Sequence, residues 1–290
     1  MSTTLNGIVV KAVGGVFTVL CGQKKWICYS PKKFRQGGFD VLVGDKVVFE
    51  DLHKSKGLIS QVLPRKNKLS RPEIANVDVC FIVLASEPQP DFYLADKVLI
   101  NCFQQSIEPI IVVNKTDLDE NLVHAVCDNY QKVAEVVAVS ALDDSVLQLK
   151  KYIGGNVACF AGQSAVGKTS IINAICPQFV GKTGGLSQKS GRGMHTTRHS
   201  SLVPVGDGYV VDTCGFSLCD LSGIRSDELR LYLDDFVEVA HNCKFTSCTH
   251  ISEPCCAVKN AVAEGKLCKA RYDRYLEEYN ELVESEINQY

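Results

Sequence analysis

The sequence has no long apolar run and no strong excess of charge of either sign. None of its apolar stretches approaches the roughly 18 residues that cross a bilayer, so we expect no membrane segment. Residues Met1–Gly7 offer neither a basic stretch nor an apolar core, which predicts no secretory signal. The formal net charge is −2, so the molecule as a whole is no general binder of polyanions. We expect a cytoplasmic protein, without a membrane partner, that is a monomer.

Cysteine, by contrast, is abundant, with 14 residues in a chain of 290. Most of the cysteines stand singly in apolar runs, where cysteine behaves as a small buried hydrophobe. This usage predicts a reducing compartment rather than a disulfide framework. The exception is a cluster that ends at Cys256. The chain length suffices for two or three domains.

The first 62 residues predict a small all-β domain. Five strands in so short a segment suit an OB-fold barrel, which commonly binds nucleic acid, although an SH3-like barrel gives a similar pattern. Met1–Val62 holds nine Lys and Arg against four acids, which suits a phosphate backbone but also a solvated lysine face. The β-rich runs, separated by glycine and proline turns, are Leu5–Val13, Val16–Cys21, Lys25–Tyr29, Lys46–Glu50 and Gly57–Val62.

A basic linker with two prolines, Leu63–Pro72, precedes a change of pattern. Apolar strand-like runs then alternate with helix-like runs, which predicts a doubly wound α/β domain. The predicted strands are Val77–Ala85, Pro109–Val113, Glu135–Val139, Asn156–Ala161 and Tyr209–Val211. The predicted helices are Asp91–Gln105, Leu122–Val133, Asp143–Tyr152 and Ser170–Cys176.

A phosphate-binding pattern, G-x-x-x-x-G-K-T, covers Gly162–Thr169 between a predicted strand and a predicted helix. Glycines let successive backbone N–H groups point at an anion, and the helix adds the positive end of its dipole. We expect Lys168 to reach the β- and γ-phosphates and Thr169 to ligate Mg²⁺. Ala165 stands where a glycine is common. If its φ angle is positive, the alanine costs about 1 kcal/mol.

Two further patterns point to a guanine nucleotide. Asn114–Asp117 read N-K-T-D directly after a predicted strand. Asp117 would accept hydrogen bonds from guanine N1–H and the exocyclic amine, and a base lacking that pair would leave the buried carboxylate unpaired. We expect the stem of Lys115 to cover the base and Asn114 to tie neighbouring loops together. Ser140–Ala141 close the next strand, where a backbone N–H meets guanine O6.

A fourth pattern, D-x-x-G at Asp212–Gly215, follows the last predicted strand. We expect Asp212 to help hold Mg²⁺ through water and the Gly215 N–H to meet the γ-phosphate. The basic, glycine-rich stretch Lys182–Arg198 is typical of a switch loop, with a flexible surface loop as the alternative. The predicted magnesium ligands are Thr169, Asp212 and either Thr196 or Thr197. The predicted GTP-binding residues are Asn114, Lys115, Thr116, Asp117, Ser140, Ala141, Gly162, Gln163, Ser164, Ala165, Val166, Gly167, Lys168, Thr169, Ser170, Asp212 and Gly215.

The order of these patterns is unusual, because the base-reading residues precede the phosphate loop. This order predicts a circularly permuted domain. The chain leaves that domain soon after Gly215, so we expect nucleotide state to be passed to the C-terminal domain. Phe216 stands where many GTPases carry a glutamine that orients water, which predicts slow turnover that depends on a partner. His195 is the nearest candidate for placing that water, and a bystander histidine is the alternative.

Four cysteines and two histidines crowd the segment His241–Cys256. Zn²⁺ takes four such ligands in a tetrahedron, and a set without an open position is structural. Cys243, Cys248 and His250 supply three ligands, the fourth is Cys255 or Cys256, and His241 is a substitute. The acidic stretch after Leu276 predicts a solvated helix face. The flanking predicted helices, which would form a small zinc-clipped domain, are Ser226–Ala240, Ala257–Glu264 and Lys269–Glu286.

Over nearly its whole length the chain resembles the circularly permuted, small-ribosomal-subunit-dependent GTPases of the RsgA (YjeQ) type. Besides the nucleotide patterns, the resemblance rests on Arg71–Pro72, Ala75–Asp78, the stretch Gly191–Thr197, and C-x₄-C-x-H-x₅-C. The last pattern selects Cys243, Cys248, His250 and Cys256 as the zinc ligands. His195 matches the catalytic histidine proposed for the family.

The resemblance implies an OB-fold RNA-binding domain (1–64), a permuted GTPase domain (72–222) and a helical zinc domain (223–290). It also implies one structural Zn²⁺, Mg²⁺ with GTP, and GTP hydrolysis stimulated by the small ribosomal subunit and its rRNA during late maturation. Ala165, Cys214 and Arg198 depart from the family pattern. Two other classes remain: a P-loop kinase, which has no reason to carry N-K-x-D, and an RNA-binding module that ignores nucleotide.

Overall fold

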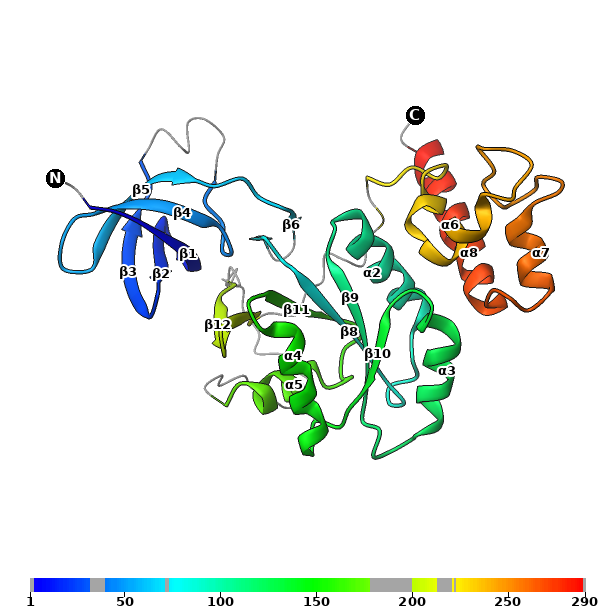
Figure 1. The fold of residues 1–290 in the computed structure, drawn as a ribbon, viewed down its shortest axis with the longest axis horizontal. Coiled ribbons are helices and arrows are strands. Elements are labelled where there is room, and N and C mark those ends of the chain that lie inside the picture. Colours follow the sequence, from blue (N-terminus) through cyan, green and yellow to red (C-terminus); the bar gives the residue numbers. More distant parts are fainter. Residues whose placement is uncertain are drawn as a thin grey trace, which may run out of the picture. The chain divides into compact units, whose positions relative to one another are not determined.

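A computed structural model describes residues 3–31, 40–70, 73–177, 200–212, 221 and 223–288 (Figure 1). The chain forms two compact units. One holds residues 1–80, 146–160 and 168–217, and the other holds residues 81–145, 161–167 and 218–290. The two base-reading loops, the first part of the phosphate loop and the cysteine cluster therefore belong to one unit.

The first five strands close into a barrel in the order β1-β2-β3-β5-β4, drawn in blue in Figure 1. Strands β3 and β5 pair in parallel, and the other neighbouring strands of the barrel pair antiparallel. Alternate side chains such as Phe17, Trp26 and Phe49 point into the barrel core. The prediction of an OB-fold barrel is confirmed, with each strand end within one residue. The strands are β1 (Thr4–Val13), β2 (Val16–Cys21), β3 (Lys24–Tyr29), β4 (Lys46–Asp51) and β5 (Lys56–Val62).

The predicted linker Leu63–Pro72 contains a short strand that the sequence pattern did not indicate. Strand β6 (Lys68–Ser70) pairs with β7 (Glu73–Ala75). Arg65 forms an ion pair of 2.7 Å with Asp45, which is fully buried. The side-chain amide of Asn76 donates to the Gly44 carbonyl at 3.0 Å. Backbone polar groups that water would satisfy in a free linker are satisfied here in part by side chains such as Asn76.

A six-stranded sheet follows, with the order β10-β9-β8-β11-β13-β12. Every residue of β8 and β11 is buried, as their uninterrupted apolar runs predicted. Strand β12 was missed because it is short and contains Pro204, and such a strand is tolerated at a sheet edge, where β12 lies. The strands are β8 (Val79–Ala85), β9 (Glu108–Asn114), β10 (Glu135–Ala138), β11 (Val157–Ala161), β12 (Leu202–Val205) and β13 (Gly208–Val211).

The helices of this domain match the predictions, except for the one predicted at Asp143–Tyr152. That segment is a 3-10 helix, η1 (Asp144–Leu149), followed by a short α4 (Lys150–Ile153). Asp143 and Ser145 accept hydrogen bonds from backbone N–H groups at its start, and such bonds compete with a regular helix. The other helices are α2 (Phe92–Gln104), α3 (Asn121–Tyr130) and α5 (Lys168–Ile175).

The C-terminal region is helical, but the predicted helix Ser226–Ala240 is wrong as a single element. Leu233 adopts an extended backbone and buries its side chain, which separates the 3-10 helix η3 (Leu229–Tyr232) from α6 (Asp234–Ala240). Helices α7 (Ala257–Ala263) and α8 (Lys269–Ile287) complete the region.

The predicted solvated face of the acidic tail is also wrong in part. Glu278 on α8 is only 1% exposed, and Glu281 pairs with Lys97 at 2.6 Å. The Glu286 carboxylate accepts from the backbone N–H of Ser226 at 2.7 Å. Within the described ranges, no helix combines the length and apolar character needed to traverse a membrane.

Candidate nucleotide site and metal centre

The phosphate loop connects β11 to α5, as its sequence pattern predicted. Two of its glycines are required by close contacts. Gly162 has a φ of 126°, and a Cβ there would lie 2.4 Å from the carbonyl oxygen of Val83. Gly167 has a φ of 97°, and its Cβ would lie 2.3 Å from Nδ2 of Asn114. Any larger residue would therefore push the loop away from the sheet and from the base-reading strand.

The middle of the phosphate loop carries backbone strain. Ala165 has a φ of 68°, so the condition for the predicted cost of about 1 kcal/mol is met. Its carbonyl oxygen accepts a hydrogen bond of 2.9 Å from the amine of Lys115, which also donates to the Glu87 carbonyl at 2.6 Å. The Lys115 side chain thus reaches from the base-reading loop to the phosphate loop.

Asn114 ties three loops together, as predicted. Its side chain is almost fully buried, and its Nδ2 donates to the carbonyl oxygen of Val166 at 2.8 Å. Its Oδ1 accepts from the backbone N–H of Ala141 at 3.2 Å. The predicted base-reading loops and the first part of the phosphate loop are therefore held together by one side chain within one unit.

The hydroxyl of Ser140 orients the carboxylate of Asp117. The Ser140 hydroxyl donates to Asp117 Oδ1 at 2.7 Å and accepts from the Leu142 N–H at 3.2 Å, so its single proton is directed at the carboxylate. The Ser140 N–H donates in turn to the Ser145 hydroxyl at 2.9 Å. Thr116 anchors the other side of the loop through a bond of 3.1 Å to the Val139 carbonyl. Sequence reasoning missed Ser145, because a lone serine outside the known patterns gives no signal.

Asp212 is held by Ser201, a second residue that the sequence did not single out. The Asp212 carboxylate accepts from the Ser201 N–H at 2.7 Å and from its hydroxyl at 2.5 Å. A carboxylate engaged in this way can act on a cation through water, and Mg²⁺ usually keeps several waters. Lys168 is buried, and the Thr169 side chain is half-buried. The Asp212 carboxylate and the Thr169 hydroxyl are oxygen donors of the kind that Mg²⁺ takes.

The remaining predicted residues divide into described and undescribed groups. Gln163 Oε1 accepts from the Asp91 N–H at 3.1 Å, Ser164 is exposed, and Ser170 is half-buried. His195, Thr196, Thr197 and Gly215 lie outside the described residues, as do Arg71–Pro72, the departures Arg198 and Cys214, and Phe216. Their roles stay predictions from sequence.

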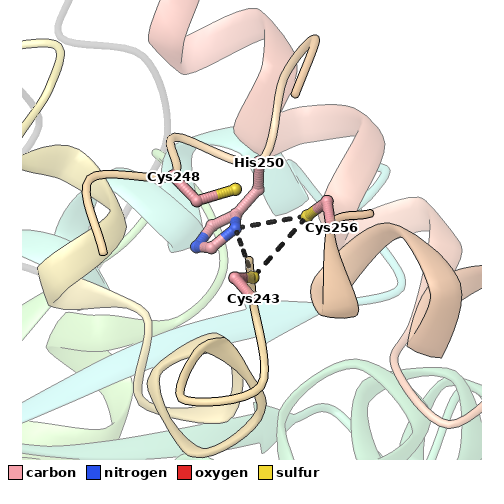
Figure 2. A group of neighbouring side chains, drawn as sticks. All are labelled: Cys243, Cys248, His250 and Cys256. Carbon is pink, nitrogen blue, oxygen red and sulfur yellow. Dashed lines mark hydrogen bonds between the residues drawn. The ribbon is translucent and has the colours of Figure 1, made fainter. Parts of the chain in front are cut away.

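Three sulfurs and one imidazole converge in the C-terminal region, as Figure 2 shows for Cys243, Cys248, His250 and Cys256. Their candidate ligand atoms all lie within 4.8 Å of one another. The Nδ1 of His250 is 3.4 Å from Cys256 Sγ, and Cys243 Sγ is 4.0 Å from Cys256 Sγ. Tetrahedral zinc with bonds of about 2.3 Å to sulfur sets neighbouring sulfurs roughly 3.8 Å apart. The four residues therefore fit Zn²⁺, whereas Cys255 is exposed.

A network of hydrogen bonds holds the loop that carries His250. Glu253 accepts from the N–H groups of Thr249 and Ile251 and from the Thr249 hydroxyl. Partial burial opposes ionisation of Glu253, but these hydrogen bonds prevail and lower its pKa to about 2. The Tyr272 hydroxyl of α8 donates to the His250 carbonyl at 2.7 Å. The loop is thus supported by contacts outside the four-residue cluster.

Comparison with known proteins supports the site. Residues 62–222 match the RsgA GTPase family, and residues 6–59 match the RsgA N-terminal domain. The chain is 39% identical to the small ribosomal subunit biogenesis GTPase RsgA of Geobacillus sp. (strain WCH70), over 96% of this chain and 98% of that protein. It is 40% identical to the RsgA of Bacillus anthracis, with the same coverage. The chain belongs to the RsgA family.

Solved structures agree with this assignment. The chain is similar to the crystal structure of YjeQ from Thermotoga maritima, with a TM-score of 0.85, 32% identity and coverage of 97% of this chain and 99% of that one. It is also similar to YloQ, a circularly permuted GTPase, with a TM-score of 0.84 and 32% identity, covering 98% and 96% of the two chains. These comparisons confirm the predicted fold class and the circular permutation. They also confirm the assignment to the GTP-hydrolysing RsgA family of small ribosomal subunit biogenesis factors.

The close approach of Gly167 to Asn114 generates a first prediction. We expect Gly167→Ala to weaken binding of a fluorescent GDP analogue about 10- to 100-fold, because the new Cβ displaces the amide that joins the loops. Gly155→Ala is the matched control, since Gly155 also has a positive φ but a Cβ there meets nothing within 4 Å. Equal affinity of the two variants would contradict the account of the loop.

The cysteine cluster generates a second prediction. We expect Cys255→Ala to retain one zinc per chain and Cys256→Ala to lose it, because only Cys256 directs its sulfur at the other three ligands. Metal content of the purified variants, measured by atomic emission, checks this. Loss of zinc from Cys255→Ala with retention in Cys256→Ala would reverse the assignment.

Proposed function

We propose that this chain binds GTP with Mg²⁺ and hydrolyses it on the small ribosomal subunit, as a factor in late maturation of that subunit. The observation that carries the proposal is the joint between the base-reading and phosphate loops. Asn114 connects them directly, and the Asp117 carboxylate is already oriented by Ser140. A loop pair held in this way needs little reorganisation to take a guanine nucleotide.

Each residue of the proposed nucleotide site has a proposed role. Asp117 pairs with the guanine edge, and the Ala141 N–H meets guanine O6. Lys168 holds the β- and γ-phosphates. Mg²⁺, when bound, neutralises charge that develops on the phosphates, and Thr169 and Asp212 would hold it with Thr196 or Thr197. The zinc ion would be structural, because four protein ligands leave no open position.

Slow intrinsic turnover is part of the proposal. Phe216 can neither donate nor accept the hydrogen bond that orients an attacking water, so the chain itself supplies at most His195 for this task. Stimulation by the small subunit then follows, because a partner must complete or order the arrangement.

The barrel supplies a surface suited to rRNA. Val16, Ile27 and Tyr29 are each about two-fifths exposed on its outer face. Their strands lie side by side, since Val16 pairs with Tyr29 and Ile27 pairs with Lys56. Exposed apolar and aromatic groups beside lysines can stack on unpaired bases and contact phosphates. This arrangement supports, beyond charge alone, RNA binding by the barrel.

Turnover measured with and without purified bacterial small ribosomal subunits tests the proposal. We expect subunits to raise GTP hydrolysis at least tenfold and to leave ATP hydrolysis at background, because the pocket excludes adenine and Phe216 replaces the glutamine that orients water in many GTPases. Phosphate transfer to another acceptor would instead indicate a kinase. Subunit binding that is indifferent to nucleotide would indicate an RNA-binding module, and either result would contradict the proposal.

A further inference from the structure

Helix α8 of the zinc region is joined to helix α2 by buried ion pairs. Arg274 Nε bonds to the Asp96 carboxylate, and the two side chains are 13% and 4% exposed. Arg271, with 2% exposure, lies 4.0 Å from Asp96 and 3.4 Å from Asp235 of α6. At the exposed end of the same contact, Glu281 pairs with Lys97. Charges along α2 thus face charges along α8 for about three turns of the longer helix.

Burying these charges between two helices costs desolvation free energy. Among the described residues, Arg271 Nε and Nη1, Asp96 Oδ1, Asp235 Oδ1 and Glu278 Oε1 are buried without a hydrogen-bond partner. Burial raises the pKa of Glu278 well above its usual value. Apolar side chains of similar size would serve stability as well or better. Buried charges of this kind fix a particular relative position of two elements, which points to a role in positioning.

The N-terminus of α2 contacts the phosphate loop. The N–H of Asp91, which precedes the helix, donates to Gln163 Oε1 at 3.1 Å. The Asp91 carboxylate caps α2 by accepting from the Leu94 N–H at 2.9 Å. Asp96 follows five residues later on the same helix. A change at Gln163 therefore reaches Asp96 through little more than one turn of hydrogen-bonded helix.

Helix α3 is held by the same arginines. Arg274 Nη2 donates to Asn129 Oδ1 at 3.0 Å, and the Arg271 guanidinium lies 5.7 Å from the centre of the Tyr130 ring. The Tyr130 hydroxyl donates to the Phe92 carbonyl at 3.2 Å, which joins α3 to α2. Helices α2 and α3 precede and follow β9, the strand that carries Asn114–Asp117. Both helices beside the base-reading strand are thus anchored to α8.

We propose that Arg274 is a positioning residue for nucleotide binding: by holding α2 through Asp96 and α3 through Asn129, it couples the phosphate loop to the zinc region. The proposal rests on the proposed binding of guanine nucleotide. Its route runs through α2 and not through the segment that follows Asp212. Coupling between two binding sites is reciprocal. A partner bound to the zinc region would therefore change nucleotide affinity by the same factor by which nucleotide changes the affinity for that partner.

Hydrogen exchange of the full-length, zinc-loaded protein, with and without GDP, tests this coupling, alongside the affinity for a fluorescent GDP analogue. In the parent protein we expect GDP to slow exchange at the phosphate loop, at the start of α2 and in residues 271–282 of α8. In Arg274→Met we expect the α8 response to vanish and the GDP dissociation constant to rise about five- to fifty-fold. Loss of stability alone would lower the unfolding temperature without removing that response.

Further variants keep the test decisive if Arg274→Met folds poorly. Lys97→Met removes the exposed pair with Glu281, and we expect it to weaken the α8 response and raise the dissociation constant about two- to fivefold. Lys269→Met is the matched control, because among the described residues Lys269 on α8 pairs within its own helix, with Asp273. We expect this control to behave as the parent. If the pair acts as a unit, the GDP dissociation constant of the double variant Asp96→Asn with Arg274→Met should be no higher than that of either single variant.

The outcomes separate the two claims. If the parent binds no guanine nucleotide, the proposed function fails. If the parent binds GDP but its α8 exchange does not respond, or if Arg274→Met and Lys97→Met both keep the parent's response and affinity, Arg274 is not a positioning residue.

Discussion

The amide of Asn114 is the interaction on which the nucleotide site depends. This nearly buried side chain donates to the Val166 carbonyl of the phosphate loop and accepts from the Ala141 N–H of the second predicted base-reading loop. The Asn114 backbone begins the first of these loops. The loops come from three separate strand ends, and no continuous backbone fixes their spacing. The side-chain amide of Asn114 can do so because both its oxygen and its nitrogen are hydrogen-bonded. An apolar residue of equal size would leave the buried Val166 carbonyl and the half-buried Ala141 N–H without this partner.

The close packing around this amide explains the strained backbone nearby. Gly167 must lack a Cβ because Asn114 occupies the space, and Ala165 accepts a positive φ in the same loop. Lys115 also has a positive φ, at 61°, and its amine bonds back to Ala165. Strain of about 1 kcal/mol at each non-glycine residue persists only where surrounding contacts determine the conformation. The phosphate loop and the base-reading loop supply these contacts to each other.

Much of this could be predicted from sequence because the signals are local. The barrel strands followed from β-rich runs between glycine and proline turns, and the two buried central strands followed from continuous apolar runs. The proposed nucleotide residues come from patterns whose spacing reflects the ligand, and their roles stay predictions. The cysteine cluster was visible by density, but its fourth ligand was not decided by spacing alone. That choice needed the family pattern, and the structure then placed the Cys256 sulfur among the others.

What could not be predicted depends on contacts distant in sequence. Ser145 and Ser201 act on Ser140 and Asp212 through bonds that no pattern of residues announces. Arg271 and Arg274 resemble ordinary charges of an amphipathic helix until Asp96, some 175 residues earlier, is seen between them. The break at Leu233 likewise reflects burial of that side chain rather than any helix-breaking residue. Tertiary burial decided each of these positions.

The central claim is that the carboxylate of Asp117 selects the base. Affinity of Asp117→Asn for guanine, xanthine and adenine diphosphates, measured by calorimetry, tests it most directly. An amide can donate to the xanthine C2 oxygen but cannot accept both guanine N–H groups, so the account predicts that preference passes from guanine to xanthine. An unchanged preference for guanine in this variant would contradict the account.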